Sequence, residues 1–178
     1  MLKLLADNRG DDLLKTEIET YSKPQVTFGY AGIDLFDNSY DFENVRIDGR
    51  PVTEAMVRTG GWKVNNGTLT PDANRWNNVL MGDSAAHDYT FSVKLRRSKG
   101  SGPVQLRVRD NGREGEANDH IAVSITPGTC EFYRSSGAVK DTLRSPKAYS
   151  FESNRWYDVK IVCKDETVSC FVDDVLLH

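Results

Sequence analysis

The sequence predicts an all-β protein whose strands form a two-sheet antiparallel sandwich of the jelly-roll type. The first observation is a strict alternation in residues 87–97, where Tyr89, Phe91, Val93 and Leu95 alternate with polar residues. The second is that the same period of two recurs near residues 104–108, 121–125 and 157–163. A period of two is typical of a strand with one buried and one solvated face. Several such strands imply two antiparallel sheets packed face to face.

The composition suits a single domain. The chain has 178 residues, enough for one large β domain with a short additional segment. We expect residues 1–14 to be a lead-in from a preceding domain and residues 15–178 to form one sandwich. The net charge of −3 gives no reason to expect nucleic acid or an anionic membrane as a partner. No apolar run approaches the roughly 20 residues that a membrane-spanning helix needs.

The first half of the chain is expected to begin with strands at 15–21 and 25–31, followed by a loop at 32–38. A further strand is expected at 40–48, and its apolar positions change parity after Phe42, which indicates a bulge. Residues 62–70 are predicted to form a tight hairpin. Its turn is Asn66-Gly67, because Asn-Gly supplies the positive φ angles of a primed turn.

In the second half, we expect strands near 78–83, 87–97, 102–110, 120–127, 129–135, 155–164 and 168–177. The segments between them carry turn residues such as Asn111-Gly112 and Pro127-Gly128. The total is eleven or twelve short strands without a long helix.

The three cysteines are too few for a disulfide framework. Cys163 and Cys170 flank the expected turn at 164–167, and both share the parity of apolar neighbours. We interpret them as buried thiols. The alternative is a cross-strand disulfide, which would indicate an oxidising compartment. A zinc site is not indicated, because no nearby histidine or further cysteine completes a tetrahedron.

Three stretches resemble concanavalin A-like β-sandwich modules. Residues 61–69 resemble their "W-x-V-x-x-G-x-L" opening, and residues 88–96 resemble the "D-Y-T" strand that follows it. Residues 154–174 resemble their closing hairpin, in which a "W-x-x-hydrophobic" strand pairs with a "C/V-x-hydrophobic-D" strand. Together these stretches cover most of residues 61–178.

The first sixty residues add a second resemblance. Residues 4–14 resemble the segment that leaves the catalytic barrel in α-L-arabinofuranosidases of glycoside hydrolase family 51. Residues 32–47, ending in Phe42-Glu43-Asn44-Val45-Arg46-Ile47, resemble the strand that opens a sandwich module inserted there. In related modules this strand closes the domain, so its early place is that of a circular permutation. The resemblance implies an inserted sandwich without the barrel and its two catalytic glutamates.

A catalytic centre is not predicted. Glycoside hydrolysis needs two carboxylates about 5 Å or 6.5–9.5 Å apart, and Glu17 and Glu19 have a suitable alternating spacing. No flanking aromatic residue or further acid accompanies them, so we interpret them as solvated edge-strand charges. His120 begins a strand on the polar parity and is expected at the surface. No nucleophile elbow accompanies it or the other two histidines.

Four oxygen-bearing side chains lie within eight residues, namely those of Asp34, Asp37, Asn38 and Asp41. Hard oxygen ligands suit calcium, so a structural calcium ion is one interpretation, although the spacing fits no EF-hand loop. The other is a turn in which Asp and Asn cap backbone groups. No cofactor is required.

Sugar binding needs a flat aromatic ring and planar polar groups. One candidate is the loop at 74–78, with Trp76 and Asn77. The other is a set of side chains with outward parity. Gln105 and Arg107 oppose the core parity of their strand, and they are grouped with His120, Tyr133 and Trp156. The alternative is an ordinary charged sheet surface.

We therefore expect a non-catalytic carbohydrate-binding module of a plant-polysaccharide-degrading glycoside hydrolase. From the resemblance, its partners are an arabinose- or xylose-containing glycan of the plant cell wall and the parent catalytic domain. The resemblance also suggests a secreted or periplasmic enzyme. The first alternative is a domain that braces the catalytic barrel and binds no sugar. The second is a sandwich glycosidase or lyase in its own right.

Overall fold

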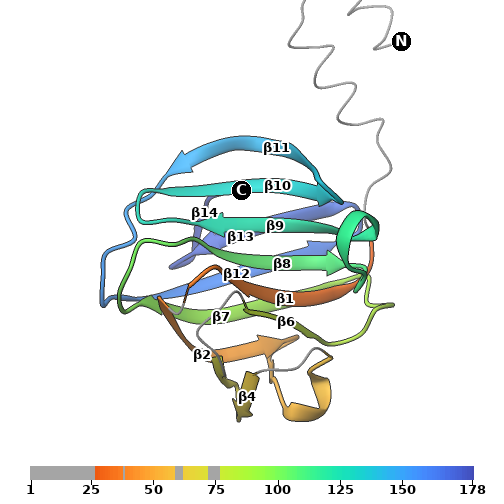
Figure 1. The fold of residues 1–178 in the computed structure, drawn as a ribbon, viewed down its shortest axis with the longest axis horizontal. Coiled ribbons are helices and arrows are strands. Elements are labelled where there is room, and N and C mark those ends of the chain that lie inside the picture. Colours follow the sequence, from red (N-terminus) through yellow and green to blue (C-terminus); the bar gives the residue numbers. More distant parts are fainter. Residues whose placement is uncertain (1–26, 38, 59–61, 72–76) are drawn as a thin grey trace, which may run out of the picture.

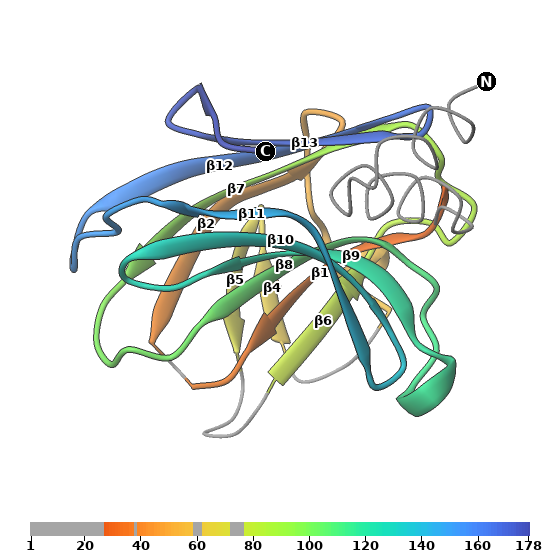
Figure 2. The ribbon, with the colours of Figure 1, turned by 90° about the horizontal axis from the view of Figure 1, so that it is seen from above.

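The computed structural model describes residues 27–178 except 38, 59–61 and 72–76. Within these residues, six strands form one antiparallel sheet, called sheet A, and eight form a second, called sheet B. The two sheets pack face to face (Figures 1 and 2). The predicted all-β sandwich is therefore confirmed.

Sheet A has the strand order β11-β10-β9-β8-β1-β6. Its strands are β1 (Tyr30–Leu35), β6 (Asn77–Met81), β8 (Val104–Asp110), β9 (Asp119–Ile125), β10 (Thr129–Ser136) and β11 (Val139–Ala148). β1 is the seam of this sheet, because it places an early segment between β6 and β8.

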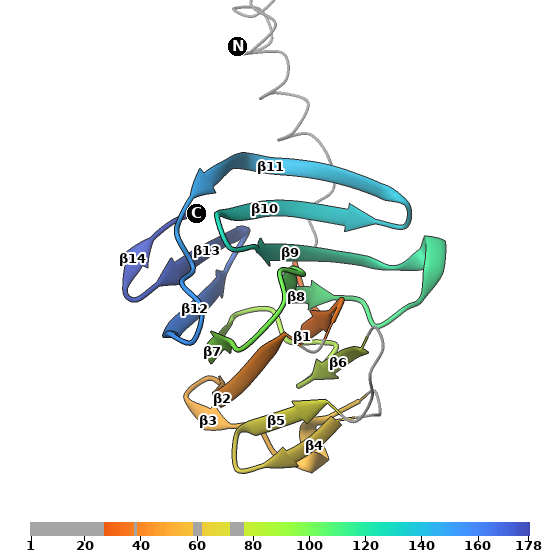
Figure 3. The same ribbon diagram turned by 60° about the vertical axis from the view of Figure 1, so that its left-hand side comes forward.

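Sheet B has the order β14-β13-β12-β7-β2-β5-β4, with β3 paired to β2. Its strands are β2 (Tyr40–Ile47), β3 (Arg50–Pro51), β4 (Trp62–Asn65), β5 (Thr68–Pro71), β7 (Tyr89–Arg97), β12 (Trp156–Lys164), β13 (Thr167–Val172) and β14 (Val175–Leu176). Figure 3 shows β2 beside the β4–β5 hairpin, far from β14. As predicted, the early strand belongs to the same sandwich as the strands after residue 61.

Two short 3-10 turns, η1 (Glu54–Met56) and η2 (Gly115–Ala117), interrupt the strands. In the described part of the chain, no helix has the length and apolar character needed to cross a membrane.

The core lies between the sheets and is built by the alternation that the sequence shows. On β7, buried and partly exposed residues alternate from Tyr89 to Leu95. β12 does the same, and its Ile161 lies opposite Phe91 in register. Both of these side chains are fully buried. Burying one large apolar side chain contributes roughly 1.5–3 kcal/mol, so these two central strands anchor sheet B against sheet A.

The predicted bulge and hairpin are both present. The pairing of β2 with β7 shifts between Glu43 and Arg46, and Asn44 adopts a φ of 51°. The extra residue restores the inward direction of Val45, which is why the apolar parity changes after Phe42. In the β4–β5 turn, Asn66 and Gly67 have φ angles of 44° and 81°, as a primed turn requires.

Two strand predictions are wrong. Residues 30–35 form β1, so the strand expected at 25–31 and the loop expected at 32–38 are displaced. β11 was not predicted, because its ten residues are mostly exposed and show no alternation. It is the edge strand of sheet A and contains Pro146, a residue that edge strands tolerate. The strand expected at 15–21 and the lead-in at 1–14 lie outside the described residues.

All three cysteines are buried and free, so the interpretation of Cys163 and Cys170 as buried thiols is confirmed. Burial raises the pKa of Cys163 to about 11. Cys170 on β13 lies close enough to Cys130 on β10 for a thiol–thiol hydrogen bond, which together with burial raises its pKa. These two thiols therefore meet between the sheets.

Candidate functional site

The outer face of sheet A carries a continuous row of side chains across its strands. Gly32 on β1 pairs with Arg107 on β8, Arg107 with Ala122 on β9, and Ala122 with Tyr133 on β10. Small residues therefore alternate with large polar ones along this row. A Cβ added at Gly32 would lie 2.8 Å from Leu80 and 3.5 Å from Arg107, so glycine permits the close packing at this position.

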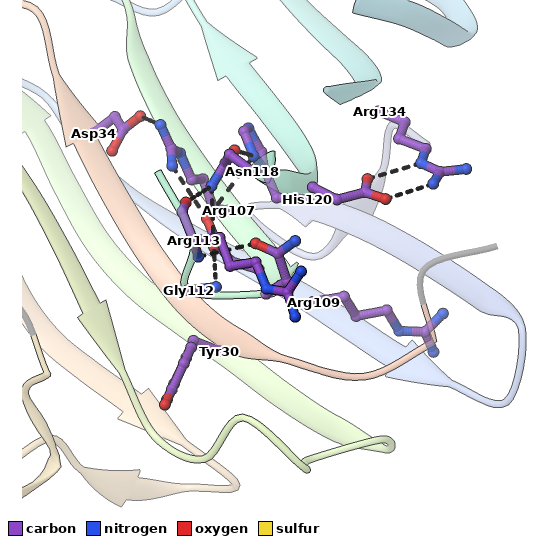
Figure 4. Close-up of polar contacts among 12 residues, drawn as sticks. Tyr30, Asp34, Arg107, Arg109, Gly112, Arg113, Asn118, His120 and Arg134 are labelled. Carbon is purple, nitrogen blue, oxygen red and sulfur yellow. Dashed lines mark hydrogen bonds and ion pairs between the residues drawn. The ribbon is translucent and has the colours of Figure 1, made fainter. Parts of the chain in front are cut away.

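Arg107 is the centre of a buried ionic network (Figure 4). Its Nη2 donates to Oδ2 of Asp34 on β1, and its Nη1 donates to Oδ2 of Asp110 at 3.1 Å. The side chains of Asp34, Arg107 and Asp110 are only 1%, 11% and 0% exposed. One cation thus joins two carboxylates that water hardly reaches, and such groups strongly influence each other because screening is weak.

Two polar atoms of this network make no hydrogen bond. Asp34 Oδ1 and Arg107 Nε are buried and have no hydrogen-bond partner among the described residues. Burial raises the pKa of Asp34 to about 6, although the neighbouring Arg107 acts in the opposite direction. A buried polar atom without a partner is costly, so an unpartnered acceptor and an unpartnered donor on two side chains that contact each other indicate a place for a bound polar group.

His120 lies beside the network as a neutral ring. Burial, assisted by the charge of Arg107, lowers the pKa of His120 to about 3. Its Nδ1 lies 2.5 Å from Oδ1 of Asn118, whose Nδ2 donates to the carbonyl oxygen of Arg113. Because the Asn118 oxygen accepts, Nδ1 carries the proton, and Nε2 presents a lone pair.

The loop after β8 fixes the position of Asp110. The backbone N–H of Gly112 donates to Asp110 Oδ1 at 2.8 Å, and the Asn118 amide donates to the same oxygen at 3.4 Å. Gly112 has a φ of 70°, and a Cβ there would lie 2.7 Å from the Tyr30 ring. A glycine is needed at this turn on both counts.

Arg109, two residues after Arg107, is not part of the site. It sits at the irregularity between β1 and β8 with a φ of 53° and is fully buried. Its backbone N–H donates to the Tyr89 hydroxyl at 2.7 Å, and its Nη2 donates to the Asp165 carbonyl at 2.5 Å. Tyr89 and Asp165 both belong to sheet B or its turns, so Arg109 joins the two sheets.

Four predicted site residues, Gln105, Arg107, His120 and Tyr133, do come together on the outer face of sheet A. The surface position expected of His120 is wrong, and Arg107 and Tyr133 are buried as well. Arg107 is 9% exposed, and His120 and Tyr133 are 4% and 5% exposed. Lys140 on β11 lies 4.2 Å from the Tyr133 ring centroid, which removes the free aromatic face expected there.

Trp156, expected to share a groove with Arg107, does not. It belongs to β12 of sheet B and lies in register with Arg96 of β7. The Arg96 guanidinium lies 4.7 Å from its ring centroid and also donates to Asp41 at 2.8 Å. Outward parity on strands of different sheets leads to opposite faces of the sandwich, and parity alone does not reveal which sheet a strand joins.

Of the two loop candidates, only Asn77 belongs to the described residues. Trp76 and Asn38 lie outside the described residues, as do Glu17 and Glu19. Asn77 begins β6 and pairs with Leu35 in register.

The predicted calcium ligands do not converge. Asp34 faces Arg107 on the outer face of sheet A, whereas Asp41 pairs with Arg96 on the outer face of sheet B. Asp37 packs against the β7–β8 loop, where a Cβ at Gly102 would lie 2.6 Å from its Oδ2. Among the described residues, no group of three or more His, Cys, Asp or Glu side chains could hold a metal ion. A calcium ion at Asp37 stays a prediction, without Asp34 or Asp41 as ligands.

The sequence reasoning missed Asp110, Asn118 and the true role of Asp34. Asp110 and Asn118 bracket a turn, so they were indistinguishable from ordinary turn residues. Asp34 alternates with Ile33 and Leu35, and this local signal would have placed it on the same outward parity as Arg107 once residues 30–35 were recognised as a strand.

One comparison with known proteins, that with protein families, found a match. Residues 33–178 match the family described as 3-keto-alpha-glucoside-1,2-lyase-like domain. Neither the comparison with curated proteins nor that with solved structures found a significant match. The match covers most of the chain and includes the strands that build the ionic network. This β-sandwich, related to domains that act on glycosides, belongs to the 3-keto-alpha-glucoside-1,2-lyase-like domain family.

Proposed function

We propose that this chain is a non-catalytic carbohydrate-binding module that binds sugar hydroxyls through the outer face of sheet A. The observation that carries the proposal is the unpartnered buried pair, Asp34 Oδ1 and Arg107 Nε, beside a neutral His120. Their side chains are already held in place by neighbouring hydrogen bonds, so their ordering cost is small. Because water hardly reaches them, a ligand has to displace the groups that cover them.

A sugar hydroxyl fits this pair because it donates one hydrogen bond and accepts others. It would donate to Asp34 Oδ1 and accept from Arg107 Nε. A second hydroxyl would donate to His120 Nε2. With two carboxylates, one guanidinium and a neutral imidazole, the site favours uncharged glycans. Arabinose- and xylose-containing glycans meet that condition, and the resemblance to modules of family 51 arabinofuranosidases supports this choice.

The same resemblance supports a parent enzyme that degrades plant cell-wall polysaccharides, secreted or periplasmic, with this module beside its catalytic barrel. In that setting the module would concentrate the catalytic domain on its polymer. The family membership supports a carbohydrate partner in general, and the choice of glycan follows from the resemblance.

The test is calorimetry and affinity electrophoresis of the chain with arabinan, arabinoxylan, xyloglucan and levan. Asp34→Asn keeps the size of the side chain but removes the charged acceptor. Because a hydrogen bond to a charged group contributes roughly 1.5–3 kcal/mol, binding should weaken at least about tenfold. Trp156→Ala, on the opposite face, is the matched control and should leave affinity unchanged.

Thermal unfolding of each variant checks that the fold persists. Equal weakening by both variants would contradict a site on sheet A. No binding of the unmodified chain to any of the four glycans would favour the alternative, a domain that braces the barrel without binding sugar.

A second candidate is lyase activity, favoured by Asp34 itself. A carboxylate with a pKa of about 6 and a free oxygen is a suitable general base near neutral pH. In the reaction that the family description names, a base removes the proton at C2, next to the C3 ketone. The C1–O bond then breaks, a C1=C2 double bond forms, and the departing alkoxide takes up a proton.

Incubation with a 3-keto-α-glucoside tests this candidate. Appearance of the unsaturated ketone, abolished in Asp34→Asn but retained in Trp156→Ala, would establish catalysis. A ligand that binds without turnover would leave the module non-catalytic.

A further inference from the structure

A second polar depression lies on the outer face of sheet B, on the opposite side of the sandwich from Arg107. It has a volume of about 370 Å³, within the usual range of small-molecule sites. It crosses β2, β7 and β12, and its lining includes Arg46, Ser92, Lys94, Asp158, Lys160 and Asp174.

The pairing register explains why the surface is hollowed there. Ser92 on β7 pairs with Arg46 on β2 and with Lys160 on β12. A short hydroxyl side chain thus stands between two long cationic ones. On one side of this position the next two rows carry long side chains at the centre, Lys94 in the groove and Arg96 beyond it, whereas the row on the other side carries the short Thr90. Ser92 is therefore the floor, and Arg46 and Lys160 are opposite walls.

Arg46 and Lys160 of the groove have weaker carboxylate partners than other cations of sheet B and its loops. Arg96 donates through two nitrogens to Asp41 and stacks on Trp156. Arg155 pairs with Asp173 at 2.8 Å and lies over the Tyr157 ring. Each of these two guanidinium groups already has a carboxylate within hydrogen-bond distance.

By contrast, Arg46 donates through Nη1 to the Gly49 carbonyl, which leaves its positive charge without a carboxylate in the described part of the chain. Lys160 lies 3.5 Å from Asp174, whose side chain is 95% exposed. Such an exposed pair contributes little and is easily exchanged. The two walls therefore keep charge available for a ligand.

An aromatic ring adjoins one wall. Phe171 on β13 pairs in register with Lys160, and the ammonium lies 5.0 Å from its ring centroid. A ligand that bridges the groove would meet two cationic walls, a hydroxyl floor and the carboxylate of Asp158, with the Phe171 ring behind the Lys160 ammonium. An oxygen anion satisfies the walls and the floor, and the hydroxyls of the sugar that carries it can donate to Asp158.

We propose that this groove binds a saccharide that carries an oxyanion, either a uronate carboxylate or a sulfate ester, with the anion between Arg46 and Lys160 above Ser92. The site is separate from the hydroxyl site on sheet A and opposite to it in charge preference. A module with both sites would contact the neutral and the acidic parts of a mixed polysaccharide on its two faces.

The test is calorimetry with four probes at an ionic strength of about 0.15 M, where charges more than about 8 Å apart are largely screened: an oligogalacturonate, a sulfated oligosaccharide, a neutral oligosaccharide of the same length, and inorganic sulfate. Arg46→Gln and Lys160→Gln should each weaken binding of the acidic saccharide at least about tenfold, because each removes a charge-assisted hydrogen bond. Lys164→Gln makes the same charge change at the end of the same strand, outside the groove, and should change affinity less than about twofold. The oligogalacturonate and the sulfated probe distinguish the two sources of the anion.

Asp34→Asn separates this proposal from the function proposed for sheet A, because it should leave binding of the acidic saccharide unchanged. Equal weakening by Lys164→Gln would show attraction to overall charge and would overturn the site. Equal affinity for the neutral oligosaccharide, or for inorganic sulfate alone, would also overturn it. So would the absence of binding to both acidic probes at millimolar concentration.

Discussion

Asp34 on β1 and Arg107 on β8 form an ion pair across neighbouring strands of sheet A, with side chains only 1% and 11% exposed. The same guanidinium also reaches Asp110, so two carboxylates depend on one cation. This arrangement ties the seam strand β1 to the centre of the sheet. Stability and ligand recognition are therefore expected to depend on the same residues.

The first prediction concerns Arg107. Arg107→Ala leaves two buried carboxylates without their cation, and breaking a buried pair from one side typically costs about 3–5 kcal/mol. Urea denaturation should show a loss of that order. Arg155→Ala removes an exposed pair whose side chains are 50% and 29% accessible, and should cost less than about 1 kcal/mol. Similar losses in both variants would contradict the buried network.

The second prediction concerns the close approach of β1 to the end of β8. Gly29 has a φ of 143°, and a Cβ there would lie 2.4 Å from the Asp110 carbonyl oxygen. Gly29→Ala should therefore displace the backbone that carries Asp110. We expect a loss of more than about 2 kcal/mol in unfolding free energy.

Gly49→Ala is the matched control. Gly49 also has a positive φ, 73°, but a Cβ there meets nothing within 4 Å. It bears only the strain of the left-handed conformation, about 1 kcal/mol. If Gly49→Ala proves as damaging as Gly29→Ala, steric contact with Asp110 is not the cause.

Much of the sandwich could be predicted because its central strands alternate without interruption. β7 and β12 each place apolar residues on one side over nine residues, and only a half-buried strand fits that pattern. The turn at Asn66-Gly67 was equally readable, since few residues tolerate its φ angles. Edge strands carry no such signal. β11 faces solvent along most of its length. Because few of its side chains enter the core, its sequence has no need to alternate apolar and polar residues.

The site was less predictable for two reasons. Parity assigns a side chain to the outward side of its own strand, but it does not tell whether Gln105 and Trp156 share a sheet. Parity also says nothing of exposure, so Arg107 was placed correctly and its burial was missed. Arg109 escapes parity altogether, because its φ of 53° turns the chain and carries the side chain toward sheet B.

The third prediction concerns the cysteines. All three are buried, and burial raises the pKa of Cys163 to about 11, so few thiolates are present at neutral pH. The folded protein should therefore react slowly with a disulfide reagent such as Ellman's. After denaturation without reductant, the sample should titrate three thiols. A count of one would show that two of them had formed a disulfide.

The fourth prediction concerns opposite responses to pH in the network. The pKa of Asp34 rises from 3.8 to about 6 on folding, so its contribution to stability is complete below about pH 4 and is lost as the pH rises to 6. The pKa of His120 falls from 6.5 to about 3, so its contribution is complete above pH 6.5 and is lost as the pH falls toward 3. Between pH 4 and 6 the two effects oppose each other, each with a slope of up to about 1.4 kcal/mol per pH unit.

In a variant that lacks one of the two titrating groups, the pH dependence of stability should show the effect of the other group. In Asp34→Asn, His120 is the remaining titrating group of the two. The unfolding free energy of this variant should therefore fall by about 2–3 kcal/mol more than that of the unmodified chain when the pH is lowered from 6 to 4. In His120→Gln, Asp34 is the remaining titrating group of the two. The unfolding free energy of this variant should therefore rise relative to that of the unmodified chain over the same change in pH. Urea denaturation at pH 4, 5, 6 and 7 measures both differences, and the carboxylates common to all three proteins cancel in the comparison. Parallel pH profiles for the three proteins would show that neither group changes its pKa on folding, and would remove the basis for a neutral His120 beside Arg107.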